Sequence, residues 1–166
     1  MNNHEYQRVR IMTWEDPKTS VRDVTAISGF DYLCSIKEGK IKPPPAAELL
    51  GYRPSEIEIG RVVFELEPAE YHYNPFGSVH GGILSTLLDT AMTAAILSTL
   101  PMGQSCSTLE IKVNFVRMIT GATGLVLCEG KIIHAGSRIA TAEGKVFDRQ
   151  AKLYAHAIST CMIRTA

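Results

Sequence analysis

The sequence predicts an α+β fold in which one long helix packs on one face of a curved antiparallel sheet. Two short segments rich in β-branched residues come first, and one long apolar segment with a helix stop signal follows them. Four segments of about ten residues, each bounded by Gly, Asp or Gln, then complete the chain. The order of two strands, one helix and four strands therefore places a single helix against a six-stranded sheet.

The N-terminal part of the chain has no strand pattern. Residues 1 to about 20 are polar and unpatterned, which is typical of a loose arm. A helix is expected from Ser20, as its N-cap, to Gly39, as its stop, and a stiff proline-rich connector follows it. We therefore divide the chain into residues 1–45, an arm with one extra helix, and residues 46–166, the main domain.

The first strands and the helix are predicted from hydrophobic periodicity. Residues 55–60 and 61–67 favour two antiparallel strands that meet at Gly60. The helix is expected over about residues 79–100, because Pro101 cannot continue it.

The four later strands are expected at residues 107–119, 124–136, 137–148 and 152–163. In the first of them, apolar residues alternate with polar ones. The pattern predicts one shared face for Leu109, Ile111, Val113 and Phe115.

The predicted helix is apolar on almost every side. Such a helix is usually buried on most sides, and one sheet cannot cover it completely. A second copy of the chain is the simplest cover for the remainder, so the sequence predicts a homodimer.

Composition and charge exclude several classes of protein. The chain of 166 residues suits one domain, and its 17 basic residues balance 17 acidic ones, so we expect no nucleic-acid or membrane partner. The N-terminus has no apolar core run of a secretory signal, which indicates a cytoplasmic protein. The four cysteines have no metal-type spacing, so we expect buried free thiols and no metal site.

One charged residue stands out in the predicted helix. Asp89 is the only Asp, Glu, Lys or Arg between Glu70 and Glu110. A carboxylate in an apolar setting is costly unless it is paired, neutralised or functional. Two interpretations stay open at this point: Asp89 bonds a neighbouring backbone group, or it takes part in chemistry.

The segment His80-Gly81-Gly82 at the helix start favours the functional interpretation. Backbone N–H groups at a helix N-terminus lack intrahelical acceptors, so they can stabilise an oxyanion during acyl transfer. An ordinary tight turn is the alternative. Gly81 and Asp89 are roughly 12 Å apart along one helix. If both serve one reaction, the site must therefore be shared between two subunits.

Residues 74–119 resemble a known family through three features: the residues Asn74, Gly77, His80, Gly81 and Gly82, the Asp nine residues after His80, and the segment TLEIKVNFVRMI. These features resemble those of the hotdog-fold acyl-CoA thioesterases of the phenylacetate-degradation (PaaI-like) branch. The resemblance covers about residues 40–165. It implies a long central helix wrapped by a curved antiparallel sheet, with dimers formed through the sheets and commonly doubled to tetramers.

The resemblance also assigns roles to individual residues. It implies that Asp89 is the general base or the nucleophile, supplied by the opposite protomer. The N–H of Gly81, helped by Gly82, would polarise the thioester carbonyl. Asn74 would hold the carbonyl or the attacking water, and His80 would shape the loop and contact the thioester.

A hydroxyl at the start of the strand after the helix orients the water in this family. Thr108 fits best here, and Ser107 is the alternative. Coenzyme A would contact surface residues near strand ends, which correspond here to Arg117, Gly136, Ser137 and Arg138; a solvated surface role is the alternative for either arginine. Met118 departs from the family, where proline often follows the arginine.

The predicted activity is hydrolysis of an acyl-CoA to a carboxylic acid and free CoA, without a metal or other cofactor. The sequence does not identify the acyl group, and aromatic, hydroxylated aromatic and medium-chain acyl groups all stay open, with an aromatic or medium-chain group expected. Two alternatives stay open: an enoyl-CoA hydratase or dehydratase on the same fold, and a non-catalytic acyl-CoA-binding protein. Only a thioesterase releases free thiol from a saturated acyl-CoA.

Overall fold

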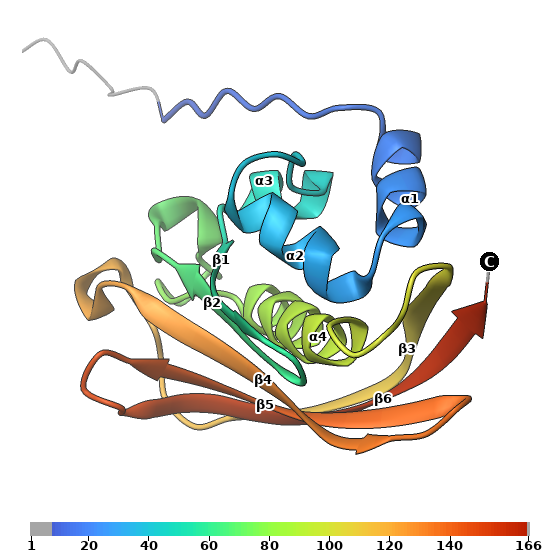
Figure 1. Cartoon of the computed structure of the whole chain (residues 1–166). Helices are drawn as coiled ribbons and strands as arrows, with labels where there is room; N and C mark the ends of the chain where they lie inside the picture. The colour runs from blue at the N-terminus through green and yellow to red at the C-terminus, as the bar shows by residue number, and fades with distance from the viewer. Residues whose placement is uncertain (1–7, 166) are drawn as a thin grey trace, which may run out of the picture.

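The long helix α4 lies along the concave face of a curved sheet, and shorter helices lie beyond α4 on the side away from the sheet (Figure 1). The structure is a computed structural model that describes residues 8–165, without the side chains of residues 20–23. Its α-helices are α1 (Pro17–Ala26), α2 (Gly29–Lys37), α3 (Pro45–Leu50) and α4 (Gly81–Leu97), and its 3₁₀ helices are Glu70–His72 and Gly121–Thr123. Its strands are β1 (Arg53–Glu58), β2 (Arg61–Leu66), β3 (Gln104–Phe115), β4 (Val126–Ala135), β5 (Ile139–Asp148) and β6 (Leu153–Thr165).

All pairings in the sheet are antiparallel, in the order β1-β2-β4-β5-β6-β3. The predicted α+β class, with one long helix against six strands, is confirmed. No helix within the described residues is long and apolar enough to cross a membrane.

The middle of α4 packs very closely on β4 and β5. A Cβ at Gly130 of β4 would overlap the backbone of Ala91, and a Cβ at Gly144 of β5 would lie 3.0 Å from Met92. These two glycines let the helix approach the sheet, so that Leu88, Ala91 and Met92 are completely buried. On the side of α4 that faces β4 and β5, contact with the sheet is sufficient to bury the apolar side chains.

The four cysteines are free thiols, as predicted. Cys128 and Cys161 are buried in the core. Cys34 and Cys106 are only half-buried, so the expectation of burial holds for two of the four.

Strand β3 lies at one edge of the sheet, and β6 is its only partner strand among residues 8–165. A β-bulge between Thr108 and Glu110 shifts the register. The extra residue reverses the alternation, so Cys106 and Thr108 before the bulge, and Ile111 after it, all turn toward the helix. Leu109 is instead 56% exposed. The predicted shared face of Leu109 and Ile111 is therefore wrong, because simple alternation does not continue through a bulge.

The single N-terminal helix expected from Ser20 to Gly39 is two helices, α1 and α2, separated at Ile27 and Ser28. Helix α1 begins earlier than expected, at Pro17, with Asp16 Oδ1 accepting from the Lys18 N–H. The prediction that Ser20 is the N-cap is therefore wrong, because residue 20 lies inside α1 and Asp16 precedes the helix.

The chain breaks between α1 and α2 because α2 starts in contact with the end of α4. Gly29 N–H donates to the Leu100 carbonyl at 3.0 Å, and a Cβ on Gly29 would overlap the Leu97 carbonyl. Ser28 Oγ then caps α2 by accepting from the Asp31 N–H at 3.1 Å. Tyr32 and Leu33 of α2 consequently join the same apolar core as α4.

Helix α3 begins inside the proline-rich segment that was expected to be a connector. Two contacts from other parts of the chain hold its C-terminal end. Arg10 donates to the carbonyls of Leu49 and Glu48 at 2.5 and 3.1 Å, and the ring Nε2 of His72 donates to the Leu50 carbonyl at 2.9 Å. These donors satisfy carbonyls that a short helix leaves without intrahelical partners.

Candidate active site

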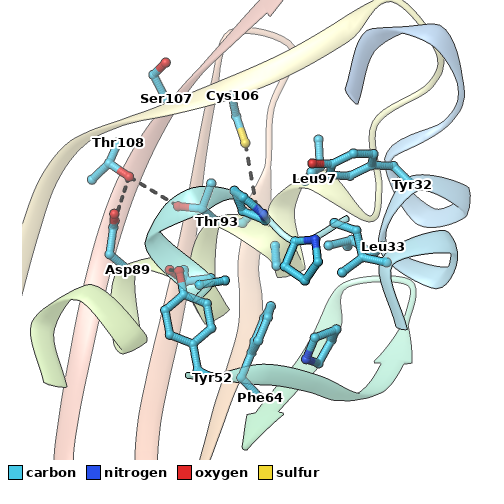
Figure 2. A pocket seen from close by; sticks show the side chains of 17 residues that line it. Tyr32, Leu33, Tyr52, Phe64, Asp89, Thr93, Leu97, Cys106, Ser107 and Thr108 are labelled. Carbon is cyan, nitrogen blue, oxygen red and sulfur yellow. Dashed lines mark hydrogen bonds between the residues drawn. The ribbon is translucent and has the colours of Figure 1, made fainter. Parts of the chain in front are cut away.

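Asp89 and Thr108 meet between α4 and β3. Thr108 Oγ1 donates to Asp89 Oδ1 at 2.7 Å and lies 3.2 Å from Thr93 Oγ1, one helical turn after Asp89 (Figure 2). Since the single proton of the Thr108 hydroxyl goes to Asp89, its oxygen accepts from Thr93. Thr93 and Thr108 therefore hold the half-buried carboxylate in one orientation.

Ser107, the alternative to Thr108, is the neighbouring residue of β3. Its side chain points away from Asp89 in Figure 2. The structure therefore brings Asp89 together with Thr108 and leaves the hydroxyl of Ser107 apart from the carboxylate.

Asp89 and Thr108 line one end of a cavity of about 450 Å³. The walls come from α2, α3, α4 and the strands β1 to β3, and they are mostly apolar. Cys106 also lines the cavity, but burial raises the pKa of its thiol to about 12, with smaller contributions from Cys161 and Asp89. Burial therefore disfavours the thiolate form that a cysteine nucleophile needs.

The start of α4 carries a second group of predicted residues. His80 caps the helix, and its Nδ1 accepts from the Gly82 N–H at 2.9 Å. Among the hydrogen bonds between described residues, none uses the Gly81 N–H. Gly81 is therefore the donor at this helix start that can meet a substrate oxygen, while the N–H of Gly82 is occupied by the His80 ring.

Asn74 shapes the loop that leads to this helix start. Its Oδ1 accepts from the Phe76 N–H at 2.9 Å and from the Ser78 N–H at 3.3 Å, and its Nδ2 donates to Ser78 Oγ at 3.2 Å. Asn74, Gly81 and Arg117 line a second cavity, of about 330 Å³. These hydrogen bonds of Asn74 therefore fix the loop that leads to Gly81.

The predicted catalytic residues consequently form two groups within one chain. We call Asp89 and Thr108 the acid group, and Asn74 and Gly81 the amide group; His80 caps the helix beside Gly81. The two groups line different cavities, and Asp89 and Gly81 are roughly 12 Å apart along the unbroken helix α4. Arg117, predicted to bind CoA, lines the cavity of the amide group.

The two groups lie beside different parts of β3. Thr108 is the β3 residue of the acid group, whereas the ring of Phe115, at the end of the strand, would touch a Cβ on Gly81 at 3.1 Å. Helix α4 therefore runs antiparallel to β3, with its start at the Phe115 end.

The predicted CoA-binding residues are also separated. Arg117 follows β3 in the chain and lies beside the first residue of β6, where its Nη1 donates to the Leu153 carbonyl at 2.6 Å. The exposed turn of Gly136, Ser137 and Arg138 lies near the other end of β6, where the Arg138 carbonyl accepts from the Ile163 N–H. These positions are roughly 30 Å apart along the strand.

Sequence reasoning missed several residues of the Asp89 cavity. Tyr52, whose Oη accepts from Thr90 Oγ1 at 3.2 Å, lines it together with Phe64 and Leu33. The polar positions Thr90 and Thr93 in the apolar helix were a usable signal, because they follow Asp89 on the face that meets the cavity. The contribution of α2 and α3 had no local signal.

Comparisons with known proteins agree with the predicted family. Residues 76–155 match the family model described as the thioesterase superfamily. The chain is 30% identical over 116 residues to the 1,4-dihydroxy-2-naphthoyl-CoA hydrolase of Listeria monocytogenes, a match that covers 70% of this chain and 91% of the relative.

Solved structures show the same fold. A phenylacetic acid degradation-related protein from Ralstonia eutropha superposes with a TM-score of 0.71 at 28% sequence identity, over 79% of this chain and 98% of that chain. The E. coli PaaI protein from the phenylacetic acid degradation operon gives a TM-score of 0.70 at 20% identity, over 81% and 95% of the two chains.

Proposed function

Since the chain belongs to the thioesterase superfamily and has the hotdog fold, we propose that it hydrolyses an acyl-CoA to a carboxylic acid and free CoA at a site shared between two copies of the chain. The protein is a thioester hydrolase. One observation supports a site shared between two copies. The predicted catalytic residues form an acid group and an amide group that lie in different cavities of one chain.

Asp89 is the general base in this proposal. Its carboxylate takes a proton from a water molecule, and the water oxygen bonds to the thioester carbonyl carbon. When the tetrahedral intermediate collapses, the carbon–sulfur bond breaks, and the CoA sulfur leaves with the proton that Asp89 had taken from the water. In the second route, an Asp89 oxygen bonds to the carbonyl carbon, the carbon–sulfur bond breaks and the CoA thiolate leaves. Water then hydrolyses the resulting mixed anhydride to the carboxylic acid and frees Asp89. Thr108 keeps the carboxylate oriented in both routes.

Gly81 supplies the oxyanion contact. Its N–H has no acceptor among the hydrogen bonds of the described residues, and it lies at the positive end of the α4 dipole. A donor of this kind stabilises the charge that develops on the carbonyl oxygen in the transition state. Asn74 and His80 act mainly on this donor, because they hold the loop and cap the helix.

Pairing of two β3 strands would unite the groups. The free edge of β3 presents unpaired backbone N–H and C=O groups, which are available to a second strand. If two copies pair antiparallel about Lys112, and Leu109 is the extra residue of the bulge, Thr108 of one strand lies opposite Phe115 of the other. The acid group of each copy then faces the amide group of the other copy.

The same pairing favours a shared CoA site. It brings the Phe115 end of one copy, with Arg117, beside the Gln104 end of the other copy, near its turn of Gly136, Ser137 and Arg138. Arginines from two copies would then contact the phosphates of one CoA. A tetramer formed from two such dimers stays a prediction.

Release of free thiol from a panel of acyl-CoA substrates tests the reaction. The wild type is expected to release CoA from saturated acyl-CoAs after dialysis against EDTA. Asp89→Asn, which preserves the shape of the side chain, is expected to lower kcat by at least about 100-fold. The exposed Glu67→Gln is the matched control. Near-normal turnover by Asp89→Asn would refute the role of Asp89.

Mixed dimers test the sharing of the site. Asp89→Asn and Gly81→Val, each inactive alone, are co-expressed with different tags, and the heterodimer is isolated by both tags. One of its two sites then contains neither substitution, so about half of the wild-type activity should return. A heterodimer as inactive as its parents would show that the two groups do not work across copies.

A further inference from the structure

We propose that α2 and α3 complete the acyl pocket of this enzyme, and that the pocket selects an aromatic acyl group. The inference rests on the proposed function, because it assigns the acyl part of the same substrate. It concerns residues that precede the region of the family match, residues 76–155. Both helices therefore lie outside the matched region.

The position of the cavity assigns it to the acyl group. Asp89 and Thr108 line one end, and Tyr32, Leu33 and Leu97 line the other (Figure 2). Asp89 and Leu97 are separated by about 12 Å along α4. A thioester whose carbonyl carbon meets the water at Asp89 can therefore extend its acyl group along α4 toward α2.

The charge of the lining determines what can enter. Among the residues that line this cavity, Asp89 is the only one with a charged side chain. No lysine or arginine is present to neutralise a phosphate or a carboxylate, and an unpaired anion is costly in such a site. The CoA phosphates are therefore excluded, and the group that enters is neutral.

Rigid rings form much of the wall. Tyr52 and Phe64 contact each other edge to face, with ring centroids 5.7 Å apart and an interplanar angle of 85°. Pro43, Pro44 and Pro54 also line the cavity, and none of its lining residues is methionine. Methionine-rich sites adapt to flexible chains, whereas fixed rings favour planar aromatic partners in stacked or edge-to-face contact. An aromatic group also loses less conformational entropy on binding than an alkyl chain.

Independent contacts hold the wall in place before any ligand binds. The start of α2 is joined to the end of α4 by the Gly29–Leu100 hydrogen bond. The end of α3 is held by Arg10 and His72. Such preorganisation reduces the cost of binding a rigid ligand.

The test fills the far end of the cavity from two different elements. Leu33→Trp adds bulk from α2, and Ala47→Leu adds bulk from α3; both residues are buried and line the cavity. Lys37→Trp, on the exposed side of α2, is the matched control. Thermal melting identifies any variant that fails to fold, and the second filling variant then carries the test.

The substrates are 2-naphthoyl-CoA, octanoyl-CoA and acetyl-CoA. The wild type is expected to prefer 2-naphthoyl-CoA over octanoyl-CoA by at least about tenfold in kcat/KM. Each filling variant should lower the ratio of kcat/KM for 2-naphthoyl-CoA to that for acetyl-CoA by at least about tenfold. Lys37→Trp should leave this ratio unchanged.

Two results would overturn the proposal. If folded filling variants slow all three substrates equally, the cavity does not hold the acyl group. If the wild type prefers octanoyl-CoA, the aromatic assignment is wrong.

A binding measurement separates this inference from the proposed function. The probe is the non-hydrolysable thioether 2-naphthylmethyl-CoA, whose dissociation constant is measured by titration calorimetry. If the wild type releases no thiol from any substrate, the proposed function fails. Tight binding that Leu33→Trp weakens would then still support the aromatic pocket, and equal binding by both proteins would refute it.

Discussion

The hydroxyl of Thr108 is fixed 2.7 Å from Asp89 Oδ1, across the junction of α4 and β3. This contact depends on the β-bulge that follows Thr108 in β3, because the bulge lets Thr108 and the later Ile111 both turn toward the helix. The orientation of the carboxylate is therefore a property of the edge strand as much as of the helix.

Replacing Thr108 tests this orientation. Thr108→Val keeps the shape of the side chain but removes the hydrogen bond, so kcat should fall by about tenfold or more, with a smaller change in KM. Thr108→Ser keeps the hydroxyl and should recover most of the loss. Steady-state thiol release gives both constants, and equal activity of the valine and serine variants would contradict the orienting role.

His72 should make stability depend on pH. Burial lowers its pKa below the ordinary 6.5, and the positive charge of Arg10 adds to this, while the bond to Leu50 acts in the opposite direction. The unfolded chain therefore binds more protons than the folded chain just below pH 6.5. The stability that neutral His72 contributes is complete above that pH and is lost as the pH falls through the lower folded pKa.

Urea midpoints between pH 5 and 8 measure this effect. His72→Gln should be less stable than the wild type at pH 7.5, but its midpoint should fall less steeply below pH 6.5. The exposed His134→Asn should keep the wild-type pH dependence. A parallel pH dependence in all three proteins would show that another group is responsible.

Gly130 should be among the positions least tolerant of a side chain. A Cβ there would overlap the backbone of Ala91, so Gly130→Ala must push α4 away from β4, at a cost of about 2–3 kcal/mol or more. The exposed neighbour Lys131→Ala should change stability by less than about 0.5 kcal/mol. Urea unfolding measures both, and a stable Gly130→Ala protein would mean that the helix does not pack this closely.

Gly29 should matter for the attachment of α2. Its Cβ would overlap the Leu97 carbonyl, so Gly29→Ala should displace the start of α2 and lower the free energy of unfolding by about 1–3 kcal/mol. Lys37→Ala, on the exposed side of the same helix, is the control. Hydrogen exchange should show faster exchange of α2 amides in Gly29→Ala alone; unchanged exchange would refute the close contact.

Most of the elements could be predicted from local patterns. The six strands and α4 follow from hydrophobic periods and turn residues, because strands and helices bury one face with a characteristic repeat. Asp89 could be singled out because an isolated carboxylate in an apolar helix is costly without a role or a partner. The structure brings Thr108 beside Asp89, and the role of Thr108 in orienting the water stays a prediction.

Three features could not be predicted in this way. The break between α1 and α2 depends on Leu97 and Leu100, far along the chain from Gly29. The exposure of Leu109 depends on the bulge in the pairing of β3 with β6, and the apolar–polar alternation in the sequence gives no sign of that bulge. Tyr32, Leu33 and Tyr52 line the cavity of Asp89, but the sequence around these residues does not indicate that they lie near Asp89.

The amino-acid sequence by itself determined which segments become strands and helix, and which carboxylate stands alone among apolar residues. Only the tertiary structure decided that this carboxylate faces Thr108, that Gly81 lines a separate cavity, and that α2 and α3 enclose the space beside Asp89. The physical reason is one of range. Periodicity records the burial of a residue relative to its near neighbours, whereas a bulge, a glycine contact or a cavity depends on atoms that meet only when distant segments pack together.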